Sequence, residues 1–290
     1  HHLWTFQDAR AIKSHIEQAD SSVIVGAGLL GIDLAAITAA QDVEGKYLMR
    51  GDCWWRYALS EEGAEIIHDA LRERDVEPVF QSGVDHFETD DDGRVTTAVD
   101  PNGDEYDADF VGIAIGLNFN TEILQDTPIE CNDGIVVDEY MQTNHEDVFA
   151  AGDITEFNDL ILGERAQNGA WGSAKEQGTI AAQNMVDYGS EPFEWVSSYS
   201  ITHFDFPFLS FGHPTLGDDE AEAKYSDTEW RRLAFKDGQI VGGVLIGDLS
   251  PQSKYKRLMR ERRDVADQKD VLMQQNFEID ELDLEETPAE

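Results

Sequence analysis

A glycine-rich turn between an apolar segment and a helical one constrains the fold of this chain more than any other feature. Residues 22–25 read Ser-Val-Ile-Val, a short, continuous and β-branched run of the kind that forms a buried strand. The turn that follows reads Gly26-x-Gly28-x-x-Gly31. Residues 29–40 are rich in Leu, Ile and Ala, which favours a helix. The segment is therefore predicted to be a strand, a tight turn and a helix.

This turn has the pattern of a Rossmann-type dinucleotide-binding motif. Gly26 permits the tight turn, Gly28 lets the backbone approach a pyrophosphate, and Gly31 lets the helix pack closely on the strand. The phosphates would lie at the helix N-terminus, where N–H groups and the helix dipole favour anions. The strand–turn–helix context favours this interpretation over a chance glycine-rich turn. The predicted contacts with a nicotinamide nucleotide are Gly26, Ala27, Gly28, Leu29, Leu30 and Gly31.

The segments that follow predict an α/β fold with a doubly wound sheet. The expected order is β-α-β-α-β, then a three-stranded meander whose turns are Asp92-Gly93 and Asn102-Gly103, then a closing strand. Ser60 is placed to cap the second of these helices. The meander takes the place of a crossover helix. The predicted strands with assigned bounds are 22–25, 46–49, 84–88, 95–99, 105–108 and 110–115.

Beyond Gly116 the pattern changes to short strands and one long helix, from Trp171 to Met185. From Phe193 onward it is rich in strands, with a hairpin turn at Lys236-Asp237-Gly238, followed by a basic helical stretch. The predicted strands are 134–137, 148–151, 200–204, 230–235 and 239–245, and the basic helix is 255–262.

Arg50 bears on which nicotinamide nucleotide would bind. It follows the second predicted strand, about 20 residues after the glycine turn, where an acidic residue would bind the ribose 2′-hydroxyl of NAD. An arginine there, with Arg56 close after it, suits the 2′-phosphate of NADP. The alternative is that Arg50 is a solvated surface residue, so NAD and NADP both stay open.

Four further motifs resemble those of the FAD-dependent pyridine nucleotide-disulfide oxidoreductases, which carry two dinucleotide-binding domains. The run 148–153, Val-Phe-Ala-Ala-Gly-Asp, is similar to the second flavin fingerprint of that family, and 174–178 is similar to its Ala-x-x-Gln-Gly helix start. Residues 114–121 and 3–9 resemble two more of its motifs. Segments 232–238 and 241–247 resemble the rubredoxin reductase and nitrite reductase large-subunit type.

The resemblance implies cofactors and site residues that local pattern alone does not. It implies FAD and NAD(P)H, with Asp153 beside Gly152 on the flavin ribityl chain and the helix from Trp171 through Ala174 and Gln177 facing the flavin ring. It places Gly116 along the nicotinamide groove. Asp33 stands where the family usually has a glutamate near the nicotinamide carboxamide. Direct hydride transfer needs no general base, so no catalytic side chain is predicted.

The resemblance also implies a domain division and a function. The family's first glycine-rich motif, which binds the FAD pyrophosphate, has no match upstream of Ser21, so the chain is expected to be N-terminally truncated. The predicted function is an FAD-dependent NAD(P)H oxidoreductase that passes electrons to a small redox protein, a nitrite-type partner or oxygen. The alternative is a non-catalytic remnant that binds nicotinamide nucleotide without flavin. The expected parts are a flavin-domain remnant or linker (1–20), an NAD(P) domain (21–116), a second flavin-domain part (117–190), a C-terminal α+β interface domain (191–265) and an acidic tail (266–290).

The charge of the chain is extreme, with 60 acidic and 21 basic residues and a formal net charge of −39. Such a surface repels nucleic acid and anionic membranes. The acids are spread along the whole chain, which predicts adaptation to a high-salt cytoplasm, where screening removes self-repulsion; the alternative is simply an acidic protein. The two cysteines, Cys53 and Cys131, and the eight histidines show no metal-ligand spacing, so no metal is expected. No apolar run approaches the ~20 residues of a membrane span.

The aromatic residues near position 206 suggest either a core or a dimer face in the C-terminal domain. A surface that binds the electron acceptor is a weaker interpretation of the same residues. Cys53-Trp54-Trp55 is interpreted as packing rather than chemistry. The aromatic set is Phe204, Phe206, Phe208 and Phe211.

Overall fold

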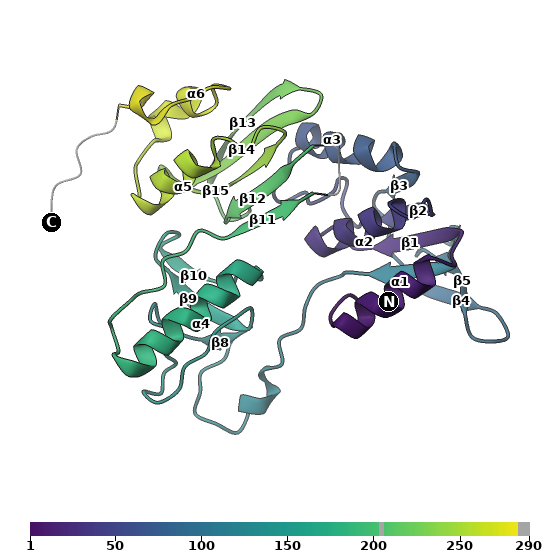
Figure 1. The fold of residues 1–290 in the computed structure, drawn as a ribbon, viewed down its shortest axis with the longest axis horizontal. Helices are drawn as coiled ribbons and strands as arrows, with labels where there is room; N and C mark the ends of the chain where they lie inside the picture. The colour runs from purple at the N-terminus through teal and green to yellow at the C-terminus, as the bar shows by residue number, and fades with distance from the viewer. Residues whose placement is uncertain (203–205, 284–290) are drawn as a thin grey trace. The chain divides into compact units, whose positions relative to one another are not determined.

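The computed structural model describes residues 1–202 and 206–283. The chain divides into two compact units, His1–Leu117 with Ile201–Phe206 and Asn118–Ser200 with Pro207–Glu290 (Figure 1). The predicted Phe204 lies outside the described residues. Each unit has a sheet and a core of its own, so each is considered by itself.

The first unit is built on a parallel sheet in the order β3-β2-β1-β7 (Figure 1). Strand β1 pairs in parallel with β2 on one side and with β7 on the other. The closing strand thus returns beside the first one, as predicted for a doubly wound sheet. The strands are β1 (Ser21–Val25), β2 (Glu44–Leu48), β3 (Val76–Val79) and β7 (Phe110–Ile113), and the helices are α1 (Phe6–Ile16), α2 (Leu29–Ala39) and α3 (Glu61–Arg72).

The two faces of this sheet are covered differently. Alternate residues of β1 point to opposite faces, so Val23 and Val25 join one cluster with Ala98 of the meander. On the other face, Ile24 and Leu34 of α2 lie close to each other beside Gly112. A Cβ added at Gly112 would contact both of their side chains. The predicted meander therefore covers one face where a helix would otherwise lie. Its antiparallel strands are β4 (His86–Thr89), β5 (Val95–Val99) and β6 (Glu105–Asp107).

Local sequence explains where the helices of this unit begin. The side chain of Ser60 accepts a hydrogen bond from the Gly63 N–H and caps α3, as predicted. One side of α3 carries buried apolar residues and the other carries acids. Thr5 and Asp8 form a capping box at the start of α1.

Residues 1–20 belong to this first unit rather than forming a separate part. The amino group of His1 donates to the carbonyl oxygen of Val111, and the Ile113 N–H donates to the carbonyl oxygen of His1. Ile12 and Ile16 of α1 are buried. These long-range contacts join residues 1–20 to β7 and are not visible in the local sequence pattern.

The second unit contains a small sheet in the order β10-β9-β8, with α4 packed on it (Figure 1). Ile180 and Ala181 of α4 join Phe157 of the sheet in one buried cluster. The helix prediction of 171–185 agrees with the observed α4. The elements are β8 (Ile135–Val136), β9 (Thr155–Asp159), β10 (Glu164–Ala166) and α4 (Trp171–Val186); a short 3₁₀ helix, η1 (Thr121–Leu124), precedes them.

The predicted strand 148–151 does not form. Phe149 makes only an isolated bridge with Gln142, and the Ala150 N–H donates to the carbonyl oxygen of Met141. Met141 has a φ of 65°, so the chain turns there and offers no extended partner strand. The apolar run is half-buried against the α4 cluster instead.

A five-stranded sheet in the order β11-β12-β15-β14-β13 forms the rest of this unit. The pairs β14–β15, β13–β14 and β12–β15 are antiparallel, and Phe208 and Phe211 are fully buried, which favours the core interpretation of the aromatic residues. The elements are β11 (Ser198–Ile201), β12 (Phe208–Gly212), β13 (Asp219–Ser226), β14 (Glu229–Lys236), β15 (Gln239–Ile246) and α5 (Gln252–Arg260).

Residues 266–283, expected to belong to an acidic tail, instead pack against this sheet domain. Leu272, Phe277 and Leu282 are buried in the same cluster as Phe235 and Tyr255. The apolar residues are too few and too widely spaced to show a helical period, which is why the segment resembled a solvated tail. It forms η2 (Ala266–Gln268), α6 (Lys269–Leu272) and η3 (Ile279–Glu281). Across the described ranges, every helix is too short or too polar to cross a membrane.

Candidate functional site

A cavity of about 420 Å³ lies at the carboxyl ends of β1, β2 and β7. Ligands of open α/β sheets bind at this end, where the strand order reverses. Its size is within the range of small-molecule sites. The residues predicted for nucleotide binding that line it are Gly26, Ala27, Gly28, Arg50 and Gly116.

The glycine turn leaves no room for side chains at two of its three glycine positions, Gly26 and Gly31. Gly26 has a φ of 116°, and a Cβ there would lie 2.0 Å from the carbonyl oxygen of Ala114. A Cβ at Gly31 would lie 2.0 Å from the carbonyl oxygen of Gly26. The close approach is reinforced by the Tyr47 hydroxyl, which donates to that same carbonyl oxygen over 2.8 Å. The turn is therefore packed tightly against both β7 and β2.

Gly28 differs, because a Cβ there would meet nothing within 4 Å. Gly28 is the N-cap of α2, has no side chain to cap the helix, and lines the cavity. The first turn of α2 contains no acidic side chain. The positive end of the helix dipole therefore faces open space that a phosphate group can enter without meeting a carboxylate.

The loop after β2 supplies the cationic wall of the cavity. Arg50 and Arg56 both line it. The guanidinium of Arg56 donates to the Tyr57 hydroxyl over 2.7 Å and lies 4.8 Å from the centre of the Tyr57 ring. Arg56 is thus held in place by its neighbour before any ligand binds.

The sequence analysis interprets Cys53-Trp54-Trp55 as packing residues. In the structure only part of this segment has that role alone. Trp54 is fully buried, whereas Cys53 and Trp55 line the cavity. Burial raises the pKa of the Cys53 thiol, so this cysteine is protonated at neutral pH and is a poor nucleophile. Trp55 has a φ of 47°, a turn conformation that the sequence pattern did not reveal.

The other residues predicted to contact the nucleotide do not line the cavity. Gly31 is buried behind the turn, where its role is close packing. Leu29, Leu30 and Asp33 are half-buried along α2. Of the predicted segment 26–31, only residues 26–28 therefore line the cavity.

The predicted flavin residues lie in the second unit, around the turn at Gly152. The Gly152 N–H donates to Oε1 of Gln177 over 2.7 Å, and the Thr155 hydroxyl lies 2.8 Å from that oxygen. Gly152 has a φ of 100°, and Asp153 beside it is half-buried. Gln177 is fully buried, so its side chain holds the turn rather than facing outward.

The other two predicted flavin residues on helix α4, Trp171 and Ala174, are more exposed than Gln177. Trp171 is 82% exposed and Ala174 is half-buried. A Cβ added at Gly152 would lie 4.0 Å from the Cβ of Ala174, so this turn and the first two turns of α4 form one surface. The Lys175 ammonium lies 5.8 Å from the centre of the Trp171 ring.

Two supporting residues were missed by sequence reasoning. Tyr47 belongs to a predicted strand, and nothing in the local pattern shows that its hydroxyl reaches Gly26, 21 positions earlier. Thr155, which shares Gln177 with Gly152, lies just after the flavin-like motif and could have been noted from its position.

These features agree with comparison to known sequences. The chain belongs to the pyridine nucleotide-disulphide oxidoreductase family, whose sequence pattern matches residues 1–182. Residues 200–263 match the rubredoxin NAD+ reductase C-terminal domain. The family resemblance seen in the motifs is thereby confirmed.

Individual relatives support the same placement. The chain is 22% identical over 265 residues to a nitrite reductase [NAD(P)H] of Bacillus subtilis, covering 90% of this chain and 32% of that protein. It is 31% identical over 202 residues to an NAD(P)H sulfur oxidoreductase (CoA-dependent) of Pyrococcus abyssi, covering 68% and 44%. The chain therefore spans about a third to a half of the length of these relatives.

Solved structures establish the fold. A ferredoxin reductase from Rhodopseudomonas palustris superposes with a TM-score of 0.87 at 17% identity, covering 97% of this chain and 69% of that one. The complex of putidaredoxin reductase with putidaredoxin gives a TM-score of 0.83 at 19% identity, covering 91% and 63%. The α/β prediction, with a C-terminal antiparallel sheet domain, is confirmed.

Proposed function

We propose that the chain is part of an FAD-dependent NAD(P)H oxidoreductase and that the cavity at Gly26–Gly28 binds the nicotinamide nucleotide. The observation that carries this proposal is the open space at Gly28 on the unblocked N-terminus of α2. A pyrophosphate fits there because the backbone can approach it closely and the helix dipole favours its charge.

We further propose that the nucleotide is NADPH in preference to NADH. Arg50 and Arg56 line the same cavity, at the end of β2 where the adenosine ribose is bound in this fold. Two guanidinium groups suit a doubly charged 2′-phosphate, and a charge-assisted hydrogen bond is stronger than a neutral one.

The turn at Gly152 and the start of α4 are proposed to hold part of FAD. Asp153 is placed to accept hydrogen bonds from ribityl hydroxyls, and the surface of Ala174 and Trp171 is apolar enough for a ring system. Gln177 and Thr155 would keep the Gly152 turn in shape. A bound flavin supplies the ability to take two electrons from a nicotinamide and to release them to an acceptor.

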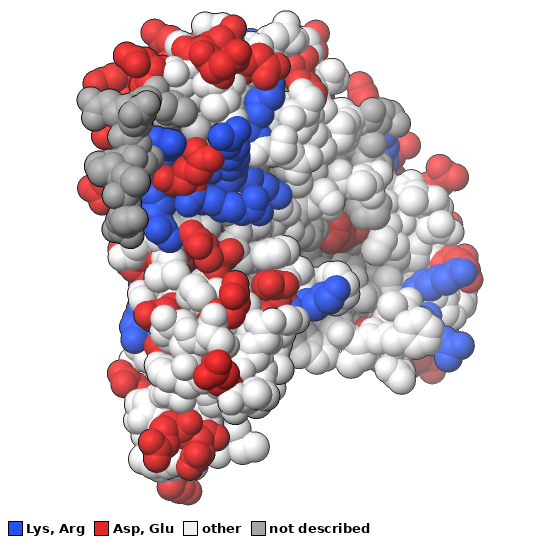
Figure 2. All heavy atoms as spheres, turned by 60° about the vertical axis from the view of Figure 1, so that its left-hand side comes forward, with Lys and Arg blue, Asp and Glu red and all other residues white. Residues whose placement is uncertain are grey.

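The proposed acceptor is a small redox protein, a proposal supported by the match of residues 200–263 to the rubredoxin NAD+ reductase C-terminal domain, and a basic cluster on the second unit is the candidate contact surface. Figure 2 shows Lys and Arg side chains gathered together on a surface that is otherwise rich in acids. Helix α5 and the residues after it carry such a concentration, and Arg257, Arg260 and Arg262 in it are exposed. Part of this charge is already balanced within the chain, because Arg257 pairs with Glu261 over 2.7 Å and Arg262 pairs with Glu194 over 2.8 Å. The basic cluster consists of Lys254, Lys256, Arg257, Arg260, Arg262 and Arg263.

The net charge of −39 supports a further proposal, that the protein works in a high-salt cytoplasm. Both cysteines are free thiols, which suits a reducing compartment. A homodimer through the C-terminal sheet domain stays a prediction.

The experiment that separates this function from a flavin-free remnant has two parts. Calorimetric titration with NADPH and NADH measures nucleotide binding, and an absorption spectrum after titration with FAD measures flavin binding. Nucleotide binding together with a flavin spectrum on the protein supports the oxidoreductase. Nucleotide binding without any retained flavin supports the remnant, and binding of neither contradicts both.

A further inference from the structure

The loop of residues 51–57 forms one wall of the nucleotide cavity, and Trp54 is its most deeply buried large side chain. Trp55 and Arg56 line the cavity, while Trp54 between Cys53 and Trp55 is fully buried. Any change that frees Trp54 from its site therefore moves the residues on either side of it.

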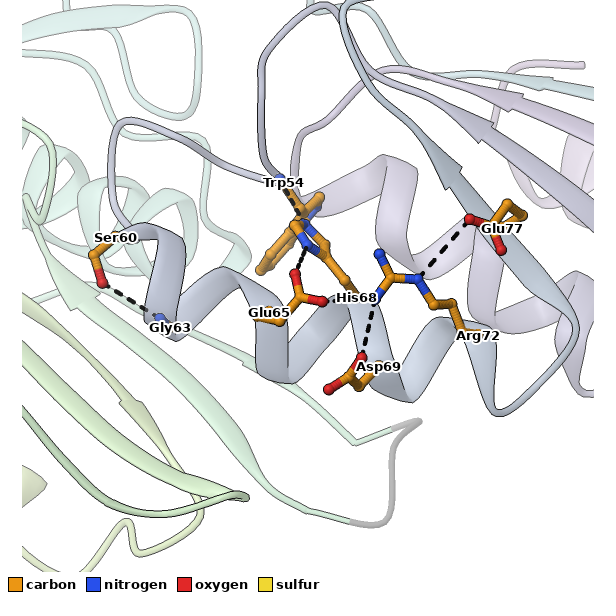
Figure 3. Close-up of polar contacts among 8 residues, drawn as sticks. All are labelled: Trp54, Ser60, Gly63, Glu65, His68, Asp69, Arg72 and Glu77. Atoms are coloured by element: carbon orange, nitrogen blue, oxygen red, sulfur yellow. Dashed lines mark hydrogen bonds and ion pairs between the residues drawn. The ribbon is translucent and has the colours of Figure 1, made fainter.

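His68 of α3 holds the backbone of Trp54 (Figure 3). The Trp54 N–H lies 3.0 Å from Nε2 of His68 and the imidazole is buried. A backbone amide can only donate, so Nε2 must be the unprotonated nitrogen that accepts. The proton of the neutral ring is then on Nδ1, which donates to Oε2 of Glu65 over 3.0 Å. The geometry thus selects one tautomer.

Charged side chains of α3 and β3 and the ring of Phe80 surround the imidazole of His68. On α3, Arg72 donates to Oε1 of Glu65 over 2.7 Å and to Asp69 over 3.0 Å, and it pairs with Glu77 of β3 over 3.9 Å (Figure 3). The Phe80 ring, which follows β3, lies 4.7 Å from the His68 ring. The loop itself presents the Trp54 amide. Arg72 thereby offsets the carboxylate that would otherwise favour a charged imidazole.

We propose that His68 is a positioning residue for nucleotide binding: its neutral ring holds the 51–57 loop against the cavity, and a second proton on the ring releases it. This inference rests on the proposed function of the cavity. Protonation would place an N–H at Nε2 against the Trp54 N–H, so two donors would face each other and the hydrogen bond would be lost. Trp55 and Arg56 would then leave the cavity wall.

Burial supports the neutral state. It lowers the pKa of His68 below its ordinary value of 6.5, although Glu65 acts in the opposite direction. Because the folded-state pKa is lowered, the stabilising contact is complete above about pH 6.5 and is lost as the pH falls through the lower folded-state pKa.

Calorimetric titration of the full chain with NADPH, from about pH 8 down to about pH 5, tests the inference. His68→Gln is the informative variant, because its amide oxygen can accept the Trp54 N–H and does not gain a proton in this range. The wild-type affinity is expected to fall five- to tenfold more than that of His68→Gln over the range. The 2′-phosphate titrates near this range as well, but it does so equally in both proteins. His86→Gln, at an exposed histidine paired with Asp85, is expected to follow the wild type.

Amide hydrogen exchange without nucleotide gives a second readout. The protection factors of the amides of residues 53–57 are expected to fall on acidification in the wild type and to stay constant in His68→Gln. Equal pH dependence of affinity and protection in the two proteins would overturn the inference. Absence of NADPH binding at every pH would contradict the proposed function instead, and the exchange measurement would still decide whether His68 holds the loop.

Discussion

The hydroxyl of Tyr47 donates a hydrogen bond of 2.8 Å to the carbonyl oxygen of Gly26. Tyr47 lies on β2 and is fully buried, whereas Gly26 begins the turn after β1. The bond joins two neighbouring strands at the end where the cavity opens. It also closes the space above Gly31, where a Cβ would lie 2.6 Å from the same hydroxyl. The shape of the nucleotide turn thus depends on a side chain outside the motif.

Replacing Tyr47 by phenylalanine is expected to lower the free energy of unfolding by about 1 kcal/mol, the usual worth of a buried hydrogen bond. Nucleotide affinity is expected to fall as well, because the Gly26 carbonyl loses its restraint. Urea unfolding and NADPH titration measure the two effects. Tyr188→Phe serves as the control, because this tyrosine is 54% exposed, its hydroxyl donates to Asp138, and it lies outside the cavity lining. Equal losses in both variants would mean that the Tyr47 hydroxyl has no special role.

Gly28→Val is expected to abolish nucleotide binding while leaving the fold intact. Gly28 has a φ of −102°, which other residues adopt, and its Cβ would enter the open space proposed for the pyrophosphate. Gly26→Val is the contrasting variant and is expected to unfold the first unit, because its Cβ would lie 2.0 Å from a backbone oxygen. Circular dichroism and calorimetry distinguish the two results. Unchanged NADPH affinity in a folded Gly28→Val protein would place the nucleotide elsewhere.

Arg50→Glu is expected to shift the preference toward NADH by tenfold or more. A charge-assisted contact to the 2′-phosphate is worth about 1.5–3 kcal/mol, and the new carboxylate would repel that group. The ratio of the dissociation constants for NADPH and NADH is the measurement. Arg10→Glu makes the same charge change on α1, outside the cavity lining, and should leave the ratio as it is. A ratio that moves equally in both variants would reflect net charge alone.

Acid is expected to weaken the second unit through Asp159. Nε2 of His213 lies 2.7 Å from Oδ2 of Asp159, and both side chains are nearly buried. Burial alone would raise the pKa of Asp159, but hydrogen bonds from His213, Leu162 and Ile161 outweigh it and hold that pKa below its ordinary value of 3.8. The stability that this carboxylate contributes is therefore present above about pH 3.8 and is lost as the pH falls below it.

Asp159→Asn provides the comparison for this effect. At neutral pH the variant is expected to be less stable than the wild type by on the order of 2 kcal/mol, since a buried charge-assisted hydrogen bond is weakened. The difference should shrink as the pH falls below about 4, because only the wild type has this proton to gain. Urea unfolding curves of both proteins across this range give the difference. A constant difference at every pH would exclude the carboxylate as the cause.

Salt is expected to stabilise the whole chain. With a net charge of −39, self-repulsion is strong at low ionic strength and is screened as the Debye length falls from about 10 Å at 0.1 M to about 3 Å at 1 M salt. The urea midpoint in KCl should rise steeply across this range and then level off. A midpoint that does not change with KCl would contradict the proposed adaptation to high salt.

The elements whose signals are local could be predicted from the amino-acid sequence. The strand, glycine turn and helix of residues 21–39 follow from side-chain shape and backbone freedom over a few positions. The start of α3 at Ser60 follows from one side chain that caps its own helix. The meander follows from two turns of glycine type. Each of these choices is made by residues within a few positions of one another, so the pattern shows them.

Which distant side chains support the candidate site depends on the tertiary structure. His68 meets Trp54, and Tyr47 meets Gly26, because their elements pack together, and residue spacing carries no trace of these contacts. The same reason explains the errors of the sequence reasoning. Residues 148–151 lack a partner strand despite their apolar character, and residues 266–283 are buried by a sheet that forms far from them in sequence. Local chemistry chooses the element, whereas burial and hydrogen-bond partners depend on what the folded chain brings beside it.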